Sequence, residues 1–545
     1  MKNPIKEKGA HKATFFGGVL VLTLANVLVK LFGFLYKVPL NRVLGDEMAN
    51  VNAAYSVYSL LYMISTAGIP VAVSVMISEA RSASKNATLC RIFRVSMVSL
   101  CLIGAIGTVG ILLFASPISR ANSGGDSYLC LLAIAPALFF VCLSSVFRGY
   151  FQGFGVMLPT AVSGMIEACG KMVLGLFLVR VILTAYGGDT HLAAGYSVFG
   201  ITIGIALGTL YLALTYARYA RSGRLTAQGR ETIAEPIRAV LLRLFRIAVP
   251  IALTAGVAGI SALIDAQLMR PLLSAYYGDA ELAKAVFSDY STGAVTLFNM
   301  PAVLVYPVAS AVVPYITAAR ARGDLREAGR YVSVGLRLSA LVSLPAALGM
   351  SVLARPILST LFVGDVDMAE HAGDLLSLLS LAIFLLGLLA VSNATLQACG
   401  KQWRPLTSMM CGVAAKVFAL YLLTPAIGPL AAPLGTVLFY LVAACMNLYF
   451  VFRYADPCVD WYRAVFVPTL AALAAAITAY GCYRFLTVAF GGGAMLVAIA
   501  AAAMVYAAIV LFFGVVSSED LLLLPRGERI LSFLTKHHLL RTNKT

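Results

Sequence analysis

One short stretch places an acid and a base inside an otherwise hydrocarbon segment. Glu167 and Lys171 lie four residues apart in the apolar run LPTAVSGMIEACGKMVLGLFL. On an α-helix this spacing brings both side chains to one face, with the acid on the favourable N-terminal side. Two interpretations follow. The pair either neutralises itself without a further role, or Lys171 binds an anionic substrate and Glu167 holds it in the absence of that substrate.

Other ionisable residues also fall within apolar runs. A charge at the centre of a membrane helix costs about 2.5–3.5 kcal/mol on insertion scales, so such residues usually face a bundle interior or a watery cavity. Cations outnumber acids in these runs, and Lys416 has Gly412 rather than an acid four residues before it. A phosphorylated substrate is therefore favoured over a cationic one. The predicted pyrophosphate-binding residues are Lys30, Lys37, Lys171, Lys416, Arg81 and Arg320, and the predicted ion-coupling or charge-pairing residues are Glu167 and Asp265.

Three arginines stand at predicted helix ends and allow two interpretations. Arg81, Arg148 and Arg320 are either solvated anchors at the membrane surface or an entrance that collects a phosphate head group. Arginine suits the second role because its planar guanidinium can bind two phosphate oxygens at once, whereas lysine acts as a point charge.

Enzyme chemistry has no sequence signature here. The ten cysteines show no metal-ligand spacing, and most lie in apolar runs, where cysteine behaves as a small hydrophobic residue. The five histidines fall at predicted helix ends or in connections. No zinc-protease, phosphate-loop, dinucleotide or nucleophile-elbow motif stands in a fitting context. The sequence predicts no catalytic residue, no metal site and no cofactor.

Composition indicates an all-α polytopic membrane protein. Of 545 residues 60% are hydrophobic and 12% charged, with a mean hydropathy of +0.89. Apolar runs of about 20 residues, the length that spans a bilayer as a helix, recur along the whole chain. The first run continues without a cleavage site and is predicted to be a retained helix rather than a signal peptide. The fourteen predicted spans are 15–40, 51–77, 93–115, 128–147, 157–183, 192–217, 247–270, 292–318, 338–363, 372–394, 405–425, 428–450, 464–487 and 493–516.

The basic residues are distributed unevenly between the two sets of connections. The net charge of +17 comes mostly from the two terminal tails and alternate connections, of which 218–246 is the richest. The opposite set contains only Arg42, Arg120 and Lys284. This asymmetry places both termini in the cytoplasm and assigns the charge to topology and anionic lipid rather than to nucleic acid. The end of 218–246, with apolar residues among arginines, predicts an interfacial amphipathic helix that links two bundles.

Two parts of the chain resemble each other. Gln152, Gly155 and Lys171 match Gln397, Gly400 and Lys416 at a constant offset of 245 residues. The matched helices are six spans apart, so the two halves have the same orientation. This parallel repeat is typical of alternating-access transporters, whose substrate site lies between the halves near mid-membrane. The predicted parts are an N-terminal lobe (1–235), a C-terminal lobe (236–455), and two further helices with a basic cytoplasmic tail (456–545).

Four stretches carry a resemblance to a known family. They are KLFGFLYKVPLNRVLGD, SVYSLLYMISTAGIPVAVSVMISE, FRGYFQGFGVMLPTAVSGMIE and TLQACGKQWRP. They resemble the stage V sporulation protein B group of lipid-linked precursor flippases, in the multidrug/oligosaccharidyl-lipid/polysaccharide exporter superfamily. Asp265 matches an acid usual in the seventh helix of that group. The resemblance implies two six-helix lobes around a cationic cavity, and two last helices that extend a groove for a polyprenyl tail.

The resemblance also implies a function. The expected activity is the movement of an undecaprenyl-pyrophosphate-linked saccharide, either the peptidoglycan precursor lipid II or a polysaccharide repeat unit, from the inner to the outer leaflet. A sporulation role and partners among cell-wall synthesis enzymes belong to the same expectation. One alternative is a cation-coupled multidrug exporter of the same superfamily, which would need more acids and typically stops at twelve helices. Another is a membrane scaffold, for which the short connections leave little surface.

Overall fold

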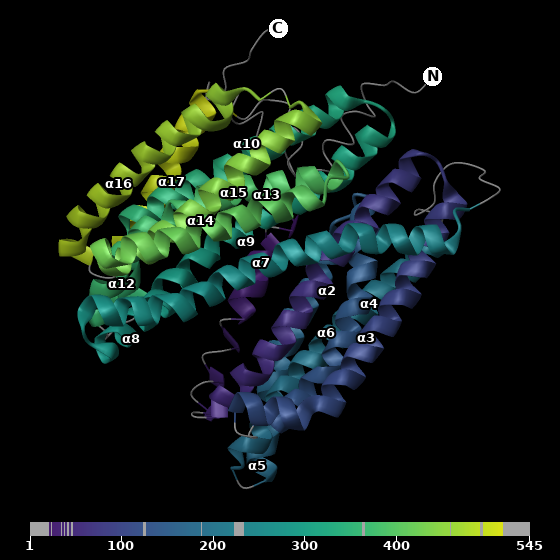
Figure 1. The fold of residues 1–545 in the computed structure, drawn as a ribbon, viewed down its shortest axis with the longest axis horizontal. Coiled ribbons are helices and arrows are strands. Elements are labelled where there is room, and N and C mark those ends of the chain that lie inside the picture. Colours follow the sequence, from purple (N-terminus) through teal and green to yellow (C-terminus); the bar gives the residue numbers. More distant parts are fainter. Residues whose placement is uncertain are drawn as a thin grey trace. The chain divides into compact units, whose positions relative to one another are not determined.

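The computed structural model describes residues 21–515, with gaps at 23, 34, 37–38, 41–42, 45–46, 124–126, 187, 223–233, 362–365, 458 and 491–493. These residues are helical and contain no strand. They form two compact units (Figure 1). The N-terminal unit comprises Gly18–Gly256 and Val313–Gly323, and the C-terminal unit comprises Val257–Val312 and the residues from Asp324 onward. Helices α7 and α9 each contribute residues to both units, because the divisions fall inside them.

Five long helices build most of the N-terminal unit. They are α2 (Met48–Ser82), α3 (Asn86–Ser123), α4 (Tyr128–Gly153), α5 (Leu158–Ala185) and α6 (Thr190–Arg221). Helix α4 packs against α2, α3 and α6, and α5 packs along α6 (Figure 1). The core contains tightly buried apolar side chains such as Leu131, Ile134 and Val198.

The C-terminal unit contains the second half of α7, α8, most of α9 and the helices from α10 onward. In chain order, these helices and turns are α7 (Ile237–Tyr277), α8 (Ala280–Asp289), the π-helical turn Tyr290–Ala294, α9 (Val295–Ala321), α10 (Leu325–Val352), α11 (Ala354–Leu361), α12 (Val366–Ser380), α13 (Ala382–Ala398), α14 (Trp403–Ile427), the 3₁₀ turn Gly428–Leu430, α15 (Ala431–Ala455), the π-helical turn Tyr462–Phe466, α16 (Val467–Phe490) and α17 (Ala494–Phe512). Helix α14 packs on α15, and α16 packs on both α10 and α17. The Tyr506 hydroxyl of α17 also donates to the Leu341 carbonyl of α10 at 2.8 Å.

The predicted spans correspond to helices in the part of the chain that the structure describes. Ten helical stretches are long and apolar enough to cross a membrane, and an eleventh results if a bent pair around Leu381 forms one span. One of the ten, Trp403–Ala455, contains two successive helices, α14 and α15. A shorter apolar helix, Leu24–Gly33, lies within the predicted span 15–40. Every predicted span therefore overlaps a helix.

The amphipathic segment at the end of 218–246 is helical, but it is not a separate helix. It forms the first turns of α7, which is 41 residues long. Pro236 precedes this helix, and Gly278, at φ +69°, follows it. Val240 and Leu244 are buried, whereas Ile237 and Phe245 are 62% and 37% exposed, so part of the apolar stripe packs inside the protein and part of it faces outward.

The internal repeat appears in the backbone at two equivalent turns. Gly155 and Gly400 follow α4 and α13 and have φ values of +74° and +75°, a left-handed conformation that glycine adopts without steric cost. The Gly155 amide donates to the Gln152 carbonyl at 2.8 Å, and the Gly400 amide donates to the Gln397 carbonyl at 3.1 Å. The sequence match at an offset of 245 residues therefore reflects the same helix-ending turn in both units.

Candidate functional site

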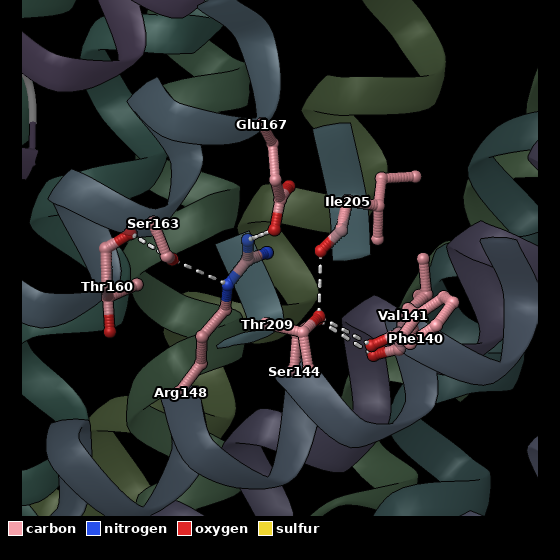
Figure 2. Close-up of polar contacts among 9 residues, drawn as sticks. All are labelled: Phe140, Val141, Ser144, Arg148, Thr160, Ser163, Glu167, Ile205 and Thr209. Atoms are coloured by element: carbon pink, nitrogen blue, oxygen red, sulfur yellow. Dashed lines mark hydrogen bonds and ion pairs between the residues drawn. The ribbon is translucent and has the colours of Figure 1, made fainter. Parts of the chain in front are cut away.

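Two ion pairs bury charge in the described part of the chain, one in each unit. The N-terminal pair joins Arg148 of α4 to Glu167 of α5, with side chains that are 15% and 16% exposed. Figure 2 shows the guanidinium directed at the Glu167 carboxylate, while its Nε lies 3.4 Å from the Ser163 hydroxyl. Ser163 in turn donates to the Thr160 carbonyl at 2.9 Å. Arg148 is therefore not a solvated anchor, since it balances the acid of the neighbouring helix.

Glycines on α6 leave room for this pair. A Cβ added at Gly208 would lie 2.6 Å from the Glu167 Cγ, and one added at Gly204 would lie 2.7 Å from the Glu167 carbonyl oxygen. Gly170 of α5 approaches Gly204 equally closely. The small residues around Glu167 and Lys171 thus permit close contact between α5 and α6. Thr209 fixes α6 to α4, because its hydroxyl lies 3.1 Å from the Phe140 carbonyl (Figure 2).

Lys171 lies against aromatic rings one turn beyond Glu167. Its Nζ is 5.0 Å from the ring centroid of Tyr36 and 5.2 Å from that of Tyr55. The Tyr36 hydroxyl donates to the Ser197 carbonyl at 3.1 Å, which fixes the ring. Ring faces attract an ammonium without neutralising its charge. The Tyr36 and Tyr55 rings therefore help to hold the Lys171 ammonium on this side of α5.

The C-terminal pair joins two residues that the sequence analysis singled out separately. The Nζ of Lys416 on α14 lies 2.7 Å from the Oδ2 of Asp265 on α7. It also lies 3.1 Å from the Ser261 hydroxyl and 3.3 Å from the Ser261 carbonyl. The Lys416 side chain is 1% exposed and that of Asp265 is 12% exposed. Lys416 thus has an acidic partner within the protein. The sequence argument that Lys416 lacks an acid and therefore needs an external anion is corrected by this contact.

The Asp265 carboxylate has a second oxygen, and this oxygen is buried. Within the described residues no hydrogen-bond donor reaches Asp265 Oδ1. A buried carboxylate oxygen without a donor is costly. The Asp265 carboxylate therefore has fewer of its possible hydrogen bonds than the Lys416 ammonium has.

The remaining predicted residues have varied surroundings. Arg81 donates through Nη1 to the Phe154 carbonyl at 2.7 Å and lies over the Phe154 ring, so it caps the end of α4. Arg320 is half-buried in the last turn of α9, and Lys30 is exposed on the helix Leu24–Gly33. Lys37 lies outside the described residues.

The predicted residues fall into separate groups. Within the N-terminal unit, Glu167 and Lys171 lie on neighbouring turns of α5, and within the C-terminal unit Asp265 and Lys416 touch. The pairing of Arg148 with Glu167 was not predicted because the two residues lie on different helices, and sequence spacing shows only neighbours on the same helix. No group of three or more His, Cys, Asp or Glu in the described chain is placed to hold a metal.

The helix arrangement is similar to the fold of solved MOP superfamily and MATE transporters. A MOP superfamily transporter from Pyrococcus furiosus matches with a TM-score of 0.68 at 15% identity, over 82% of this chain and 98% of that chain. The Vibrio cholerae MATE transporter VcmN matches with a TM-score of 0.69 at 15% identity, over the same shares of the two chains.

The sequence then identifies the family. Residues 15–319 match the polysaccharide biosynthesis protein family, and residues 272–422 match the MatE family. The chain belongs to the polysaccharide biosynthesis protein family and is a multi-pass membrane protein.

Three relatives come from Bacillus subtilis. The uncharacterized membrane protein YabM is 27% identical over 89% of this chain and 89% of its own length. The lipid II flippase MurJ is 24% identical over 80% of this chain and 82% of its own length. Stage V sporulation protein B is 25% identical over 56% of this chain and 58% of its own length.

Proposed function

We propose that this protein is a flippase for an undecaprenyl-pyrophosphate-linked saccharide, which it moves from the inner to the outer leaflet by alternating access. The similarity to the lipid II flippase MurJ over 80% of the chain carries this proposal. The substrate is lipid II or a polysaccharide repeat unit, and cell-wall synthesis enzymes would supply it. The protein acts as a transporter and not as an enzyme.

The proposed substrate contacts follow from the charges of the N-terminal unit. Glu167 is neutralised by Arg148, so it does not cancel the charge of Lys171 on its own. The Lys171 ammonium lies over two ring faces, which attract a cation and hold it near the Glu167 turn. We assign Lys171 as the primary head-group cation, with Lys30, Lys37, Arg81 and Arg320 as further candidates. Lys416 joins them only when Asp265 releases it.

The organisation of the chain is part of the same proposal. Residues 1–235 and 236–455 would act as the two lobes that rock during the cycle, and 456–545 would extend the path for the polyprenyl tail. Both termini would lie in the cytoplasm, because the basic connections alternate along the chain.

Binding of lipid II to purified Lys171→Gln protein tests the assignment. Loss of the cation should weaken binding about fivefold to tenfold, the effect of a charge-assisted contact of 1–1.5 kcal/mol. Lys284→Gln is the matched control, since Lys284 is an exposed lysine that pairs with Glu281 at 3.8 Å. Unchanged lipid II binding by a correctly folded Lys171→Gln protein would remove Lys171 from the site.

The multidrug exporter is the second candidate, and the structural likeness to MATE transporters favours it. Native mass spectrometry of protein extracted gently from its own membrane separates the two. A retained polyprenyl-pyrophosphate species, whose mass also identifies the saccharide, supports the flippase. Retention of phospholipid alone, together with binding of added organic cations, contradicts it.

A further inference from the structure

A group of cations and aromatic rings lies where α14 begins and α15 ends in the C-terminal unit. The Nζ of Lys401 is 4.9 Å from the ring centroid of Tyr454, and the Arg404 guanidinium is 4.8 Å from that of Phe450. Arg404 Nη2 also lies 3.5 Å from the Tyr454 hydroxyl. Arg453 Nη1 lies 3.4 Å from the Tyr449 hydroxyl. These six residues are called the basic–aromatic patch below.

The three cations of this patch are exposed and have no carboxylate partner among the residues that the structure describes. Other exposed cations do have one. Arg355 pairs with Asp374 at 2.8 Å, and Lys284 pairs with Glu281. The nearby acid Asp460 is directed to Arg463, at 3.6 Å. The patch therefore presents uncompensated positive charge on aromatic supports.

Further aromatic side chains lie next to the patch in the chain. Trp403, Trp461 and Tyr462 are all more than half exposed, as is Tyr449 of the patch itself. Trp461 stacks on Phe452 of α15 with ring centroids 5.8 Å apart, which joins the start of the last helical pair to the same surface. Exposed Trp and Tyr at helix ends are typical of the membrane–water interface, where the ring is embedded and its polar atom reaches the head groups. The cations thus lie at head-group depth.

We propose that the basic–aromatic patch binds the phosphodiester head group of an anionic membrane phospholipid. The charge is complementary, and the three cations can surround a phosphate while the rings support the glycerol and upper acyl carbons. The alternation of basic connections places 395–404 and 453–463 on the cytoplasmic side, where anionic lipids attract basic residues. This proposal does not depend on the transported substrate, since it concerns lipid held at the outside of one unit.

Lipid titration followed by native mass spectrometry tests the patch. The probe is phosphatidylglycerol, with phosphatidylcholine as the zwitterionic reference. In the triple variant Lys401→Gln/Arg404→Gln/Arg453→Gln the preference for phosphatidylglycerol should fall about fivefold for each cation removed. The double variant Lys284→Gln/Arg355→Gln removes exposed but paired cations and should keep the preference of the wild-type protein.

Two further variants separate charge from fold. Lys401→Arg/Arg404→Lys/Arg453→Lys keeps every charge and should retain most of the preference, whereas Tyr454→Leu keeps the cations and should lose part of it. An unchanged preference in the triple variant overturns the proposal, as does an equal loss in the double variant. If the triple variant loses lipid II binding but keeps its phosphatidylglycerol binding, the patch binds the substrate instead, and the proposal is also overturned. Failure of the flippase proposal would appear separately, as absence of lipid II binding in the wild-type protein.

Discussion

At the scale of single residues, the buried ion pairs determine which cations are available to a substrate. Lys416 contacts both Asp265 and Ser261, so an anion that approaches it must compete with a carboxylate that is already desolvated. Lys171 lies instead over the ring faces of Tyr36 and Tyr55. Two lysines at equivalent positions of the repeat therefore have different surroundings. We infer that the N-terminal unit carries the head-group cation and that the C-terminal unit carries an internal charge pair.

A double-mutant cycle tests the strength of the Asp265–Lys416 pair. Lys416→Met and Asp265→Asn should each reduce the free energy of unfolding by about 3–5 kcal/mol, because each leaves one buried charge without its partner. The double variant Asp265→Asn/Lys416→Met should cost clearly less than the sum of the two, since no uncompensated charge remains. Unfolding of the detergent-solubilised protein measures all three free energies.

The exposed pair Arg355–Asp374 provides the comparison for this cycle. Its side chains are 64% and 65% exposed, so solvent screens their attraction and the same cycle should give a coupling energy of about 0–1 kcal/mol. Equal coupling energies in the two cycles would show that Asp265 and Lys416 are solvated in the folded protein, and the argument that Lys416 is unavailable would fail.

At the scale of helices, the sequence predicted the elements well and their mutual contacts poorly. Apolar runs of bilayer length determine where a membrane helix forms, and each predicted span overlaps a helix. Pairs such as Arg148–Glu167 and Asp265–Lys416 join different helices, and sequence spacing contains no information on helix rotation. The start of α7 was predicted to be a separate helix for a related reason, because an amphipathic stripe is the same whether it faces lipid head groups or a neighbouring helix.

The contact between α5 and α6 gives a prediction at this scale. In Gly204→Ala the new Cβ would lie 2.7 Å from the Glu167 carbonyl oxygen and 2.8 Å from the Lys171 amide nitrogen, both rigid backbone atoms. Separation of the two helices should lower the free energy of unfolding by about 1–3 kcal/mol. It should also weaken lipid II binding, since Glu167 and Lys171 move together with α5.

Gly110→Ala is the matched control in α3. Nothing lies within 4 Å of its added Cβ, so only the helix preference of alanine acts, and the substitution should stabilise by about 0.5–1 kcal/mol. Chemical unfolding of both variants measures the free energy of unfolding, which should fall in Gly204→Ala and rise in Gly110→Ala. A neutral or stabilising effect of Gly204→Ala would mean that the α5–α6 contact is looser than the structure shows.

At the scale of the whole molecule, the fold is similar to that of solved transporters, and the orientation of the chain in the membrane is predicted from the charges of its connections. The helix termini at two short turns supply suitable test positions. Helix α2 ends at Ser82 and α3 begins at Asn86, in a connection that carries Lys85 and is predicted to be cytoplasmic. Helix α7 ends at Tyr277 and α8 begins at Ala280, in a connection predicted to lie outside. The two turns should therefore be accessible from opposite sides.

Insertion of the small fragment of a split fluorescent protein at each turn measures this orientation. With the large fragment expressed in the cytoplasm, a tag after Ser84 should give fluorescence, and a tag after Gly278 should give none. Both positions have a positive φ in a turn between helices, so an inserted loop does not interrupt a helix. A tag at the C-terminus should fluoresce as the first does, because the even number of predicted spans returns the chain to the cytoplasm. Immunodetection of the Gly278 tag on intact spheroplasts is the control for a protein that gives no fluorescence. It shows that the protein is present and that the tag is exposed on the outer side. Fluorescence from the Gly278 tag would show that the topology is the reverse of the predicted one. The proposed substrate would then enter from the opposite leaflet.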